Sequence, residues 1–148
     1  MTTQRSRPDW DSYFINLAQA ISMRSTCTRR MYGAIIVNDR AIVATGYNGA
    51  ARGEPNCIDT QQCVREQMNV PKGERYELCV AIHAEANAII SAPMTSTIGA
   101  TIYIAGRNSD GTLASGQPCL MCARMITNAK IAKLVYLNED GEIITVDY

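Results

Sequence analysis

The sequence predicts one α/β domain, spanning residues 1–148, built on a mixed sheet of five strands. The chain has 148 residues, which is enough for one substantial core, and it contains no internal repeat and no low-complexity tract. Its patterns give the order helix, two strands, helix, strand, helix, two strands. Strand–helix–strand units join parallel strands through right-handed crossovers, whereas hairpins join antiparallel ones. We therefore expect both kinds of pairing in one sheet.

The first elements follow a polar arm from Met1 to Pro8. Asp9 is an N-cap candidate for a helix. Apolar residues then recur at helical spacing, and we expect this partly aromatic stripe to pack in the core: Trp10, Tyr13, Phe14, Leu17, Ala18 and Ile21. The runs Ala34–Val37 and Ala41–Ala44 flank a polar turn at Asn38–Arg40, which predicts a β-hairpin.

A long polar segment separates this hairpin from the second half of the chain. Between Gly46 and about Ala81 the sequence is rich in Gly, Pro, Asn, Gln and charged residues, and it holds three of the six cysteines. A loop of that length inside a compact domain is usually functional, and Asp59–Met68 has room for a short helix. We expect this segment to form part of a pocket wall.

The second half alternates helices and strands. We predict helices at His83–Ile90 and Cys119–Asn128, and strands at Ala100–Ile104, Lys133–Leu137 and Glu142–Val146. Each helix begins after a loop, so the two helix N-termini should meet at one end of the sheet. Open α/β sheets place their ligands at such an end.

Composition excludes several classes of protein. The 14 basic and 14 acidic side chains give no general attraction for nucleic acid. No apolar run approaches the roughly 20 residues of a bilayer span, so we expect no membrane segment. The first residues lack the apolar core of a signal peptide, and we expect a cytoplasmic chain whose six cysteines are thiols.

Four residues suggest a catalytic metal site. His83, the sole histidine, is followed by Glu85 and much later by Cys119 and Cys122. Two thiolates and one imidazole suit zinc, which in a catalytic site keeps its fourth position for water. Cys119 and Cys122 project to one side of a first helical turn, where the dipole favours thiolate. Glu85 is then free to move protons. In the alternative interpretation, His83 caps a helix and the cysteines are small buried hydrophobic residues.

These residues also carry a family resemblance. The pattern H-x-E followed by P-C-x-x-C is the signature of zinc nucleobase deaminases. The stretches His83–Ile89 and Pro118–Cys122 resemble the cytidine and deoxycytidylate deaminase superfamily, and Arg24–Arg30 and Thr45–Ala50 are similar to segments that mark its deoxycytidylate (dCMP) deaminases. The resemblance covers about Met23 to Tyr136. It implies a three-layer α/β/α sandwich of the cytidine deaminase type, zinc-dependent hydrolysis of dCMP to dUMP and ammonia, and a homo-oligomer, commonly a hexamer.

The resemblance also assigns roles by position. His83, Cys119 and Cys122 match the zinc ligands, and Glu85 matches the proton shuttle. The positions that match substrate contacts are Asn48 and Ala84 for the nucleoside and Arg24, Ser25 and Thr26 for the 5′-phosphate. Gly46, Tyr47, Asn48 and Gly49 match a segment associated with regulation by dCTP and dTTP. Read alone, Arg24 is equally well a solvated charge, and Tyr47-Asn48-Gly49 an ordinary turn.

Three questions stay open from the sequence. Gly106–Gly116 lengthens the approach to the cysteine pair, and Gln117 stands where the family usually has glutamate. The substrate could therefore be another cytosine nucleotide or nucleoside, or another nucleobase, and a catalytically silent nucleotide sensor is a rival of a different class. Some relatives carry a second, structural zinc near the positions of Cys27 and Cys57. Without another histidine, that site would need thiolates or carboxylates.

Overall fold

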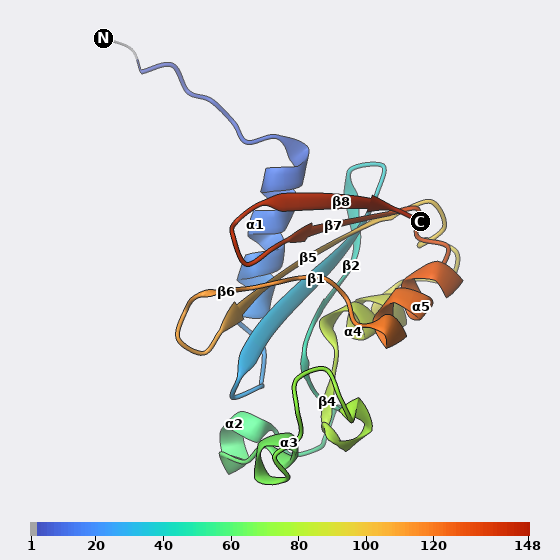
Figure 1. Ribbon diagram of the computed structural model, residues 1–148. Coiled ribbons are helices and arrows are strands. Elements are labelled where there is room, and N and C mark those ends of the chain that lie inside the picture. The colour runs from blue at the N-terminus through green and yellow to red at the C-terminus, as the bar shows by residue number, and fades with distance from the viewer. Residues whose placement is uncertain (1–2) are drawn as a thin grey trace.

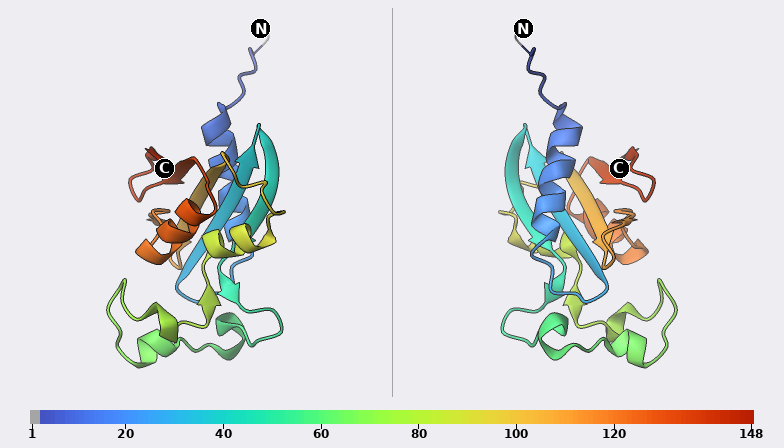
Figure 2. Two further views of the ribbon diagram at one scale, coloured as in Figure 1. Left: turned by 90° about the vertical axis from the view of Figure 1, so that its right-hand side faces the viewer. Right: turned by 90° about the vertical axis from the view of Figure 1, so that its left-hand side faces the viewer.

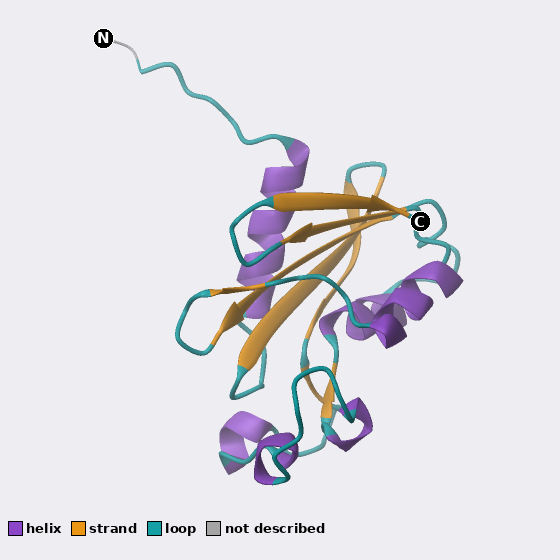
Figure 3. Ribbon diagram, viewed as in Figure 1, coloured by secondary structure: helices purple, strands orange, loops and turns teal. Residues whose placement is uncertain are grey.

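The predicted mixed sheet is present in the computed structural model, which describes residues 3–148. The strands are β1 (Arg30–Asn38), β2 (Ala41–Tyr47), β3 (Gly49–Ala50), β4 (Ala81–Ile82), β5 (Thr101–Asn108), β6 (Leu113–Ala114), β7 (Lys133–Leu137) and β8 (Ile143–Asp147). The main sheet has the order β2-β1-β5-β7-β8, with β6 beside β5 (Figures 1 and 3). Only β5 and β7 pair in parallel within it. The predicted five strands are confirmed, while β6 and the small β3–β4 pair were not predicted.

The helices complete a three-layer sandwich. They are α1 (Trp10–Ser22), α2 (Cys57–Thr60), α3 (Val64–Gln67), α4 (Ala84–Ser91) and α5 (Leu120–Asn128), with a 3-10 turn at Tyr76–Leu78. Helix α1 covers one face of the sheet, and α4 and α5 cover the other (Figure 2). None of these helices has the length and apolar character needed to cross a bilayer. The expected α/β/α architecture is therefore confirmed.

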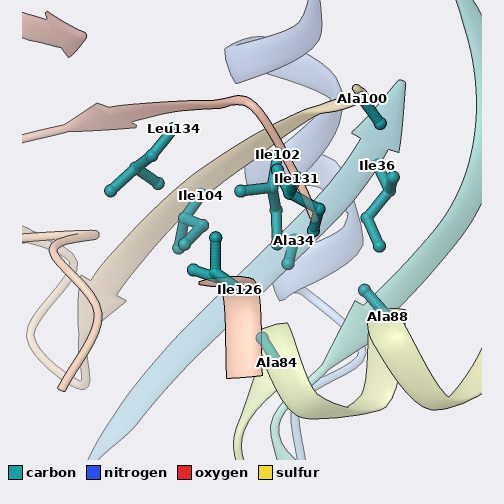
Figure 4. Close-up of a cluster of buried hydrophobic side chains, with 10 residues drawn as sticks. All are labelled: Ala34, Ile36, Ala84, Ala88, Ala100, Ile102, Ile104, Ile126, Ile131 and Leu134. Atoms are coloured by element: carbon teal, nitrogen blue, oxygen red, sulfur yellow. The ribbon is translucent and has the colours of Figure 1, made fainter. Parts of the chain in front are cut away.

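The two faces of the sheet follow from the alternation of side chains along β1. Ile35 and Val37 pack with Phe14 of α1, whereas Ala34 and Ile36 point to the opposite face. On that face, isoleucine side chains of β1 and β5 meet the small residues of α4 and Ile126 of α5 (Figure 4). Both faces are buried, which explains why the central strands read as nearly continuous apolar runs.

Helix α1 begins as predicted, but its aromatic stripe is only partly core. The Asp9 carboxylate accepts a hydrogen bond from the Ser12 amide at 2.7 Å, which makes Asp9 the N-cap. Phe14 is buried, whereas Trp10 and Tyr13 are 47% and 42% exposed. The prediction of core packing is therefore wrong for Trp10 and Tyr13, because of the three rings only that of Phe14 belongs to the core cluster, and the other two pack around it.

The segment Gly106–Gly116 forms a hairpin where we expected a loop. Strand β5 runs past the predicted end at Ile104 to Asn108, and β6 pairs back on it. The Asp110 carboxylate accepts the Thr112 amide at 2.9 Å, and Gly111 adopts a φ of 88° that favours glycine. This turn chemistry allows the strand to continue, so only the end of the segment reaches the site.

The close packing of α4 on β2 depends on a glycine. A Cβ atom added at Gly46 would collide with the Ala84 carbonyl oxygen and the Ala88 amide nitrogen. Both obstacles are backbone atoms of α4, so a side chain could fit only if the helix moved away from the sheet. Gly46 thus sets the distance between α4 and the sheet, and with it the position of the residues at the start of that helix.

Candidate metal centre and active site

Two helix N-termini bring together three potential metal ligands. His83 and Cys119 are the N-cap residues of α4 and α5, and Cys122 lies in the first turn of α5. The Cys119 sulfur accepts a hydrogen bond from the Cys122 amide at 3.4 Å, which directs both cysteine side chains to one side. Their sulfur atoms lie 3.6 Å and 3.3 Å from His83 Nδ1. In residues 3–148 this is the one group of three or more such donors whose ligand atoms all lie within 4.8 Å of one another.

These distances match a tetrahedral zinc site. Zinc bonds of about 2.3 Å to sulfur and 2.0–2.1 Å to nitrogen place tetrahedral ligands about 3.6–3.8 Å apart. The separations from His83 Nδ1 to the two sulfur atoms therefore need almost no adjustment. Three protein ligands of this kind leave a fourth position for water or substrate, which is the arrangement of catalytic zinc.

The electrostatics of the site also favour a bound cation. Burial raises the pKa of the Cys122 thiol well above its ordinary range, and the charges of Glu85 and Cys119 beside it raise the pKa further. A sulfur in this environment keeps its proton unless a positive charge is added. A divalent cation supplies that charge, so binding should release protons and should strengthen as pH rises. The residues present thus fit zinc in both geometry and charge.

Glu85 lies beside the metal ligands without belonging to their group. It occupies the first turn of α4, its side chain is 5% exposed, and it lines the same pocket as His83 and Cys119. A buried carboxylate next to an open metal position is placed to accept and return protons.

The pocket above this centre is lined by a basic and aromatic wall. The pocket has a cavity volume of about 130 Å³. The ligands His83 and Cys119 and the carboxylate of Glu85 form one end. Other lining residues include Arg29, Arg30, Tyr32, Arg65, Tyr76, Gly116 and Gln117. Of the three guanidinium groups, that of Arg29 is paired with Glu66, and the two others outnumber the one lining carboxylate, so the pocket is suited to an anionic ligand.

Two of the five predicted substrate contacts lie in this pocket. Asn48 and Ala84 line it, whereas Arg24, Ser25 and Thr26 are not among the lining residues. Arg24 is exposed just past the end of α1. The Ser25 hydroxyl accepts the Cys27 amide at 3.3 Å and the Thr26 hydroxyl accepts the Ala50 amide at 3.3 Å, so both order the backbone here. Phosphate binding by these three residues stays a prediction.

Asn48 has a structural task in addition to the predicted one. Its side-chain oxygen accepts the Tyr32 amide at 2.8 Å, and its side-chain nitrogen donates to the Arg30 carbonyl at 3.0 Å. Both bonds fasten the end of β2 to β1 at the pocket floor. One N–H of the amide remains for a ligand.

Sequence reasoning missed the arginine wall. Arg29, Arg30 and Arg65 belong to polar stretches in which a charged residue is ordinarily solvated, and nothing in their spacing marks a pocket. Arg65 and Arg30 lie 35 positions apart in the sequence, and only the folded chain brings them to the same wall. The expectation that the segment after Gly46 forms part of a pocket wall is confirmed by Cys63, Arg65 and Tyr76.

The remaining four cysteines lie in or near the same pocket. Cys27, Cys63 and Cys79 line the pocket together with His83 and Glu85. Burial raises the pKa of the Cys57 thiol, and nearby Cys27, Cys79 and Cys63 raise it further. All four are free thiols. Their sulfur atoms do not converge as closely as the donors at His83, since no second tight donor group occurs in the described residues.

Comparison with known proteins places this geometry in a family. The family profile "Cytidine and deoxycytidylate deaminase zinc-binding region" matches residues 8–138. Among curated proteins, the deoxycytidylate deaminase of Mycobacterium phage D29 is 39% identical over 139 residues, covering 90% of this chain and 98% of the phage protein. That of Schizosaccharomyces pombe is 34% identical over 140 residues, and the match spans 92% of this chain but 39% of the yeast protein.

Solved structures show the same resemblance. The dCMP deaminase of cyanophage S-TIM5 in its apo form superposes with a TM-score of 0.61 at 26% identity, covering 90% of this chain and 86% of the phage chain. The same enzyme in complex with dCMP and dUMP gives a TM-score of 0.61 at 25% identity, covering 90% and 85% of the two chains. Zinc is thus supported by a matching family as well as by the donor geometry.

Replacing one ligand should remove the metal from this centre. We expect Cys122→Ser to lower the zinc content of the purified protein by about one ion per chain, whereas Met121→Ser, at the exposed neighbouring position, should keep it. A ligand at 100 times its Kd stabilises the native state by about 2.7 kcal/mol, or roughly 5–10 °C in Tm for a domain of this size. Elemental analysis and thermal unfolding measure both effects. Equal zinc content in Cys122→Ser and the unchanged protein would contradict the assignment.

Proposed function

Because the chain belongs to the cytidine and deoxycytidylate deaminase family, we propose that it hydrolyses dCMP to dUMP and ammonia. One observation carries this proposal: a single pocket is lined by Glu85, by His83 and Cys119 of the three-donor group, and by three arginine side chains. The first group suits the hydrolysis of an exocyclic amine, and the arginines suit a phosphate on the same substrate.

In this reaction the residues of the chain hold the metal and move protons. When held by His83, Cys119 and Cys122, zinc would activate a water molecule at neutral pH. Glu85 takes one proton from the attacking water as its oxygen bonds to C4 of the cytosine ring, and passes that proton to N3. Glu85 then takes the second proton from the new C4 hydroxyl and passes it to the exocyclic amine, whose bond to C4 breaks as the carbonyl forms, so that dUMP and ammonia are released. The burial of Glu85 keeps bulk water from competing for these protons.

The rival functions fit the pocket less well. A nucleoside would leave Arg30 and Arg65 without an anion, since Arg29 alone of the three pocket arginines has an ion-pair partner within residues 3–148. A silent nucleotide sensor would not need a buried carboxylate beside an open metal position, because unpaired buried charge costs stability. The net charge of zero favours a small nucleotide over a nucleic acid as the substrate.

Regulation by dCTP and dTTP is a further part of the proposal. The segment Gly46–Gly49 connects β2 to the helix that carries Glu85: the Tyr47 carbonyl accepts a hydrogen bond from the Asn87 side chain at 2.8 Å, and Gly49 pairs with Ile82 of β4. Effector binding there would act directly on α4. We expect dCTP to activate and dTTP to inhibit, with a coupling of roughly 1–3 kcal/mol, and rate curves unmoved by either nucleotide would remove this part.

Self-association, up to the hexamer that the family resemblance implies, is also proposed. Large apolar side chains on and beside α4 and α5 are exposed in one chain, among them Ile90, Met94, Leu120 and Met121. A second copy of the chain would cover them, as exposed apolar patches often mark interfaces. Sedimentation that gives the mass of one chain at assay concentration would oppose self-association.

A cytoplasmic location likewise stays a prediction, which cell fractionation would test.

The reaction itself is tested by ammonia release from a panel of substrates. We expect the zinc-loaded protein to release ammonia from dCMP with the highest kcat/KM, and to act less well on deoxycytidine, cytidine, guanine and adenosine-containing RNA. Preference for the unphosphorylated nucleoside would contradict the dCMP assignment and leave the metal chemistry standing. Release from none of them would contradict the enzymatic function.

The role of Glu85 is tested by its amide. Glu85→Gln should keep its zinc, because Glu85 is not a ligand, and should lower kcat by roughly 10²–10⁴, which is the usual contribution of a positioned acid-base group. Ser91→Ala, at the exposed end of the same helix, serves as the control. Loss of zinc from Glu85→Gln would indicate that Glu85 is a metal ligand. Unchanged turnover would show that Glu85 takes no part in catalysis.

A second zinc ion is proposed near Cys27 and Cys57. The thiols of Cys63 and Cys79 lie close enough to Cys57 to raise its pKa, so four sulfur donors are available in that region. We expect close to two zinc ions per chain in protein purified with zinc, and close to one in Cys57→Ser. A Cys57→Ser protein that still held two would exclude this site.

A further inference from the structure

We propose that Arg65 binds the phosphate of the substrate from the wall of the pocket that also holds the metal ligands. The proposal rests on the proposed function, because it names the residue that would select a nucleotide over a nucleoside. Arg65 is 8% exposed and lines the same pocket as His83 and Glu85. A charged side chain buried to this degree normally has an anionic partner.

The partner of Arg65 is missing from the described chain. The ion pairs found in residues 3–148 are Arg29 with Glu66 and Arg75 with Glu77. Arg65 instead donates from Nε to the Glu74 carbonyl at 3.2 Å and from Nη2 to the Pro71 carbonyl at 3.0 Å. These two bonds use two of the five guanidinium N–H donors, which leaves donors for a ligand in the pocket.

The Arg65 guanidinium is also fixed before any ligand arrives. Its central carbon lies 4.8 Å from the centre of the Tyr76 ring. Two carbonyl bonds and a stacked ring hold a side chain that would otherwise lose several rotatable bonds on binding. A planar fork that is already oriented matches the oxygen atoms of a phosphate.

Tyr76 also sets the distance between Arg65 and the metal. Its ring packs edge-on against the imidazole of His83, with centres 4.9 Å apart. Arg65 and His83 therefore contact the same ring, and their separation cannot exceed the two distances together. This places the guanidinium within the length of one mononucleotide from the metal ligands, as needed if the base is at the metal and the phosphate at Arg65.

The other two arginines of the pocket are less suited to this role. Arg29 is neutralised by Glu66, whose carboxylate oxygen lies 3.0 Å from Arg29 Nε. Arg30 donates to the Asn108 side chain at 3.3 Å and remains partly solvated. Arg65 combines burial, fixed orientation and the lack of an acidic partner, so it should contribute most of the selectivity for phosphate.

The experiment compares dCMP with deoxycytidine in the zinc-loaded protein. Arg65→Gln keeps hydrogen-bonding capacity toward the carbonyls but removes the charge, and we expect a loss of roughly 10- to 150-fold in kcat/KM for dCMP, with none for deoxycytidine. Arg65→Lys keeps the charge without the fork and should fall between. Arg75→Gln, an exposed arginine of the same segment, is the control and should change neither. Equal losses on both substrates, or no loss on dCMP, would overturn the proposal.

Binding measurements separate this inference from the function itself. In titrations of the zinc-loaded protein, dUMP should bind more tightly than deoxyuridine, and Arg65→Lys should reduce that advantage. If dCMP is not turned over but the advantage of dUMP depends on Arg65, the inference holds and the proposed reaction fails. If dCMP is turned over and the advantage of dUMP is unchanged in Arg65→Lys, the inference fails and the reaction stands. Should Arg65→Gln not fold, the same two outcomes for Arg65→Lys decide.

Discussion

The active-site end of the structure depends on potential metal ligands that are buried together and that need a bound cation to ionise. Cys122 is completely buried beside Glu85 and Cys119, and this environment raises the pKa of its thiol. The thiolate is therefore disfavoured unless a metal ion binds it. Two helices hold these groups in place. The N-termini of α4 and α5 meet over one face of the sheet, and the small residues Ala84 and Ala88 with Ile126 provide the packing that fixes them there. Gly46 lets α4 come close enough to β2 for this to happen.

A pocket with two chemically different ends follows from that arrangement. The end built on α4 and α5 carries the soft donors and the buried carboxylate, and it is the proposed place of the reaction. The other end is built on the segment between β3 and β4, where Arg65 and Tyr76 lie. Tyr76 contacts both Arg65 and His83, so a shift of this segment would displace the His83 ring. In the proposed function, the segment with Arg65 recognises the phosphate and the starts of α4 and α5 carry out the reaction. The Tyr76 ring contacts both parts.

The sequence predicts local features of this molecule well and distant ones poorly. Lys133–Leu137 is found as predicted and Asp9 is the predicted N-cap, whereas α4 and α5 begin one residue after the predicted starts, with His83 and Cys119 as their N-caps. Capping and periodicity are properties of neighbouring residues, so the sequence locates such features to within about one residue. The metal ligands were predictable because their residue types and spacing are unusual. The role of Arg65 was not predictable, because its burial results from contacts with Pro71, Glu74 and Tyr76 that leave no periodic pattern in the sequence. The exposure of Trp10 was missed for a similar reason: helical spacing identifies a face but not how far the sheet extends beneath it.

The central claim is that zinc has three protein ligands and that Glu85 is not among them. A crystal structure of the zinc-loaded protein, with anomalous differences measured on both sides of the zinc absorption edge, tests it most directly. The account predicts a zinc peak about 2.0–2.3 Å from His83 Nδ1 and from the sulfur atoms of Cys119 and Cys122, with a water molecule in the fourth position. A peak bonded to the Glu85 carboxylate, or the absence of zinc from these three residues, would contradict it.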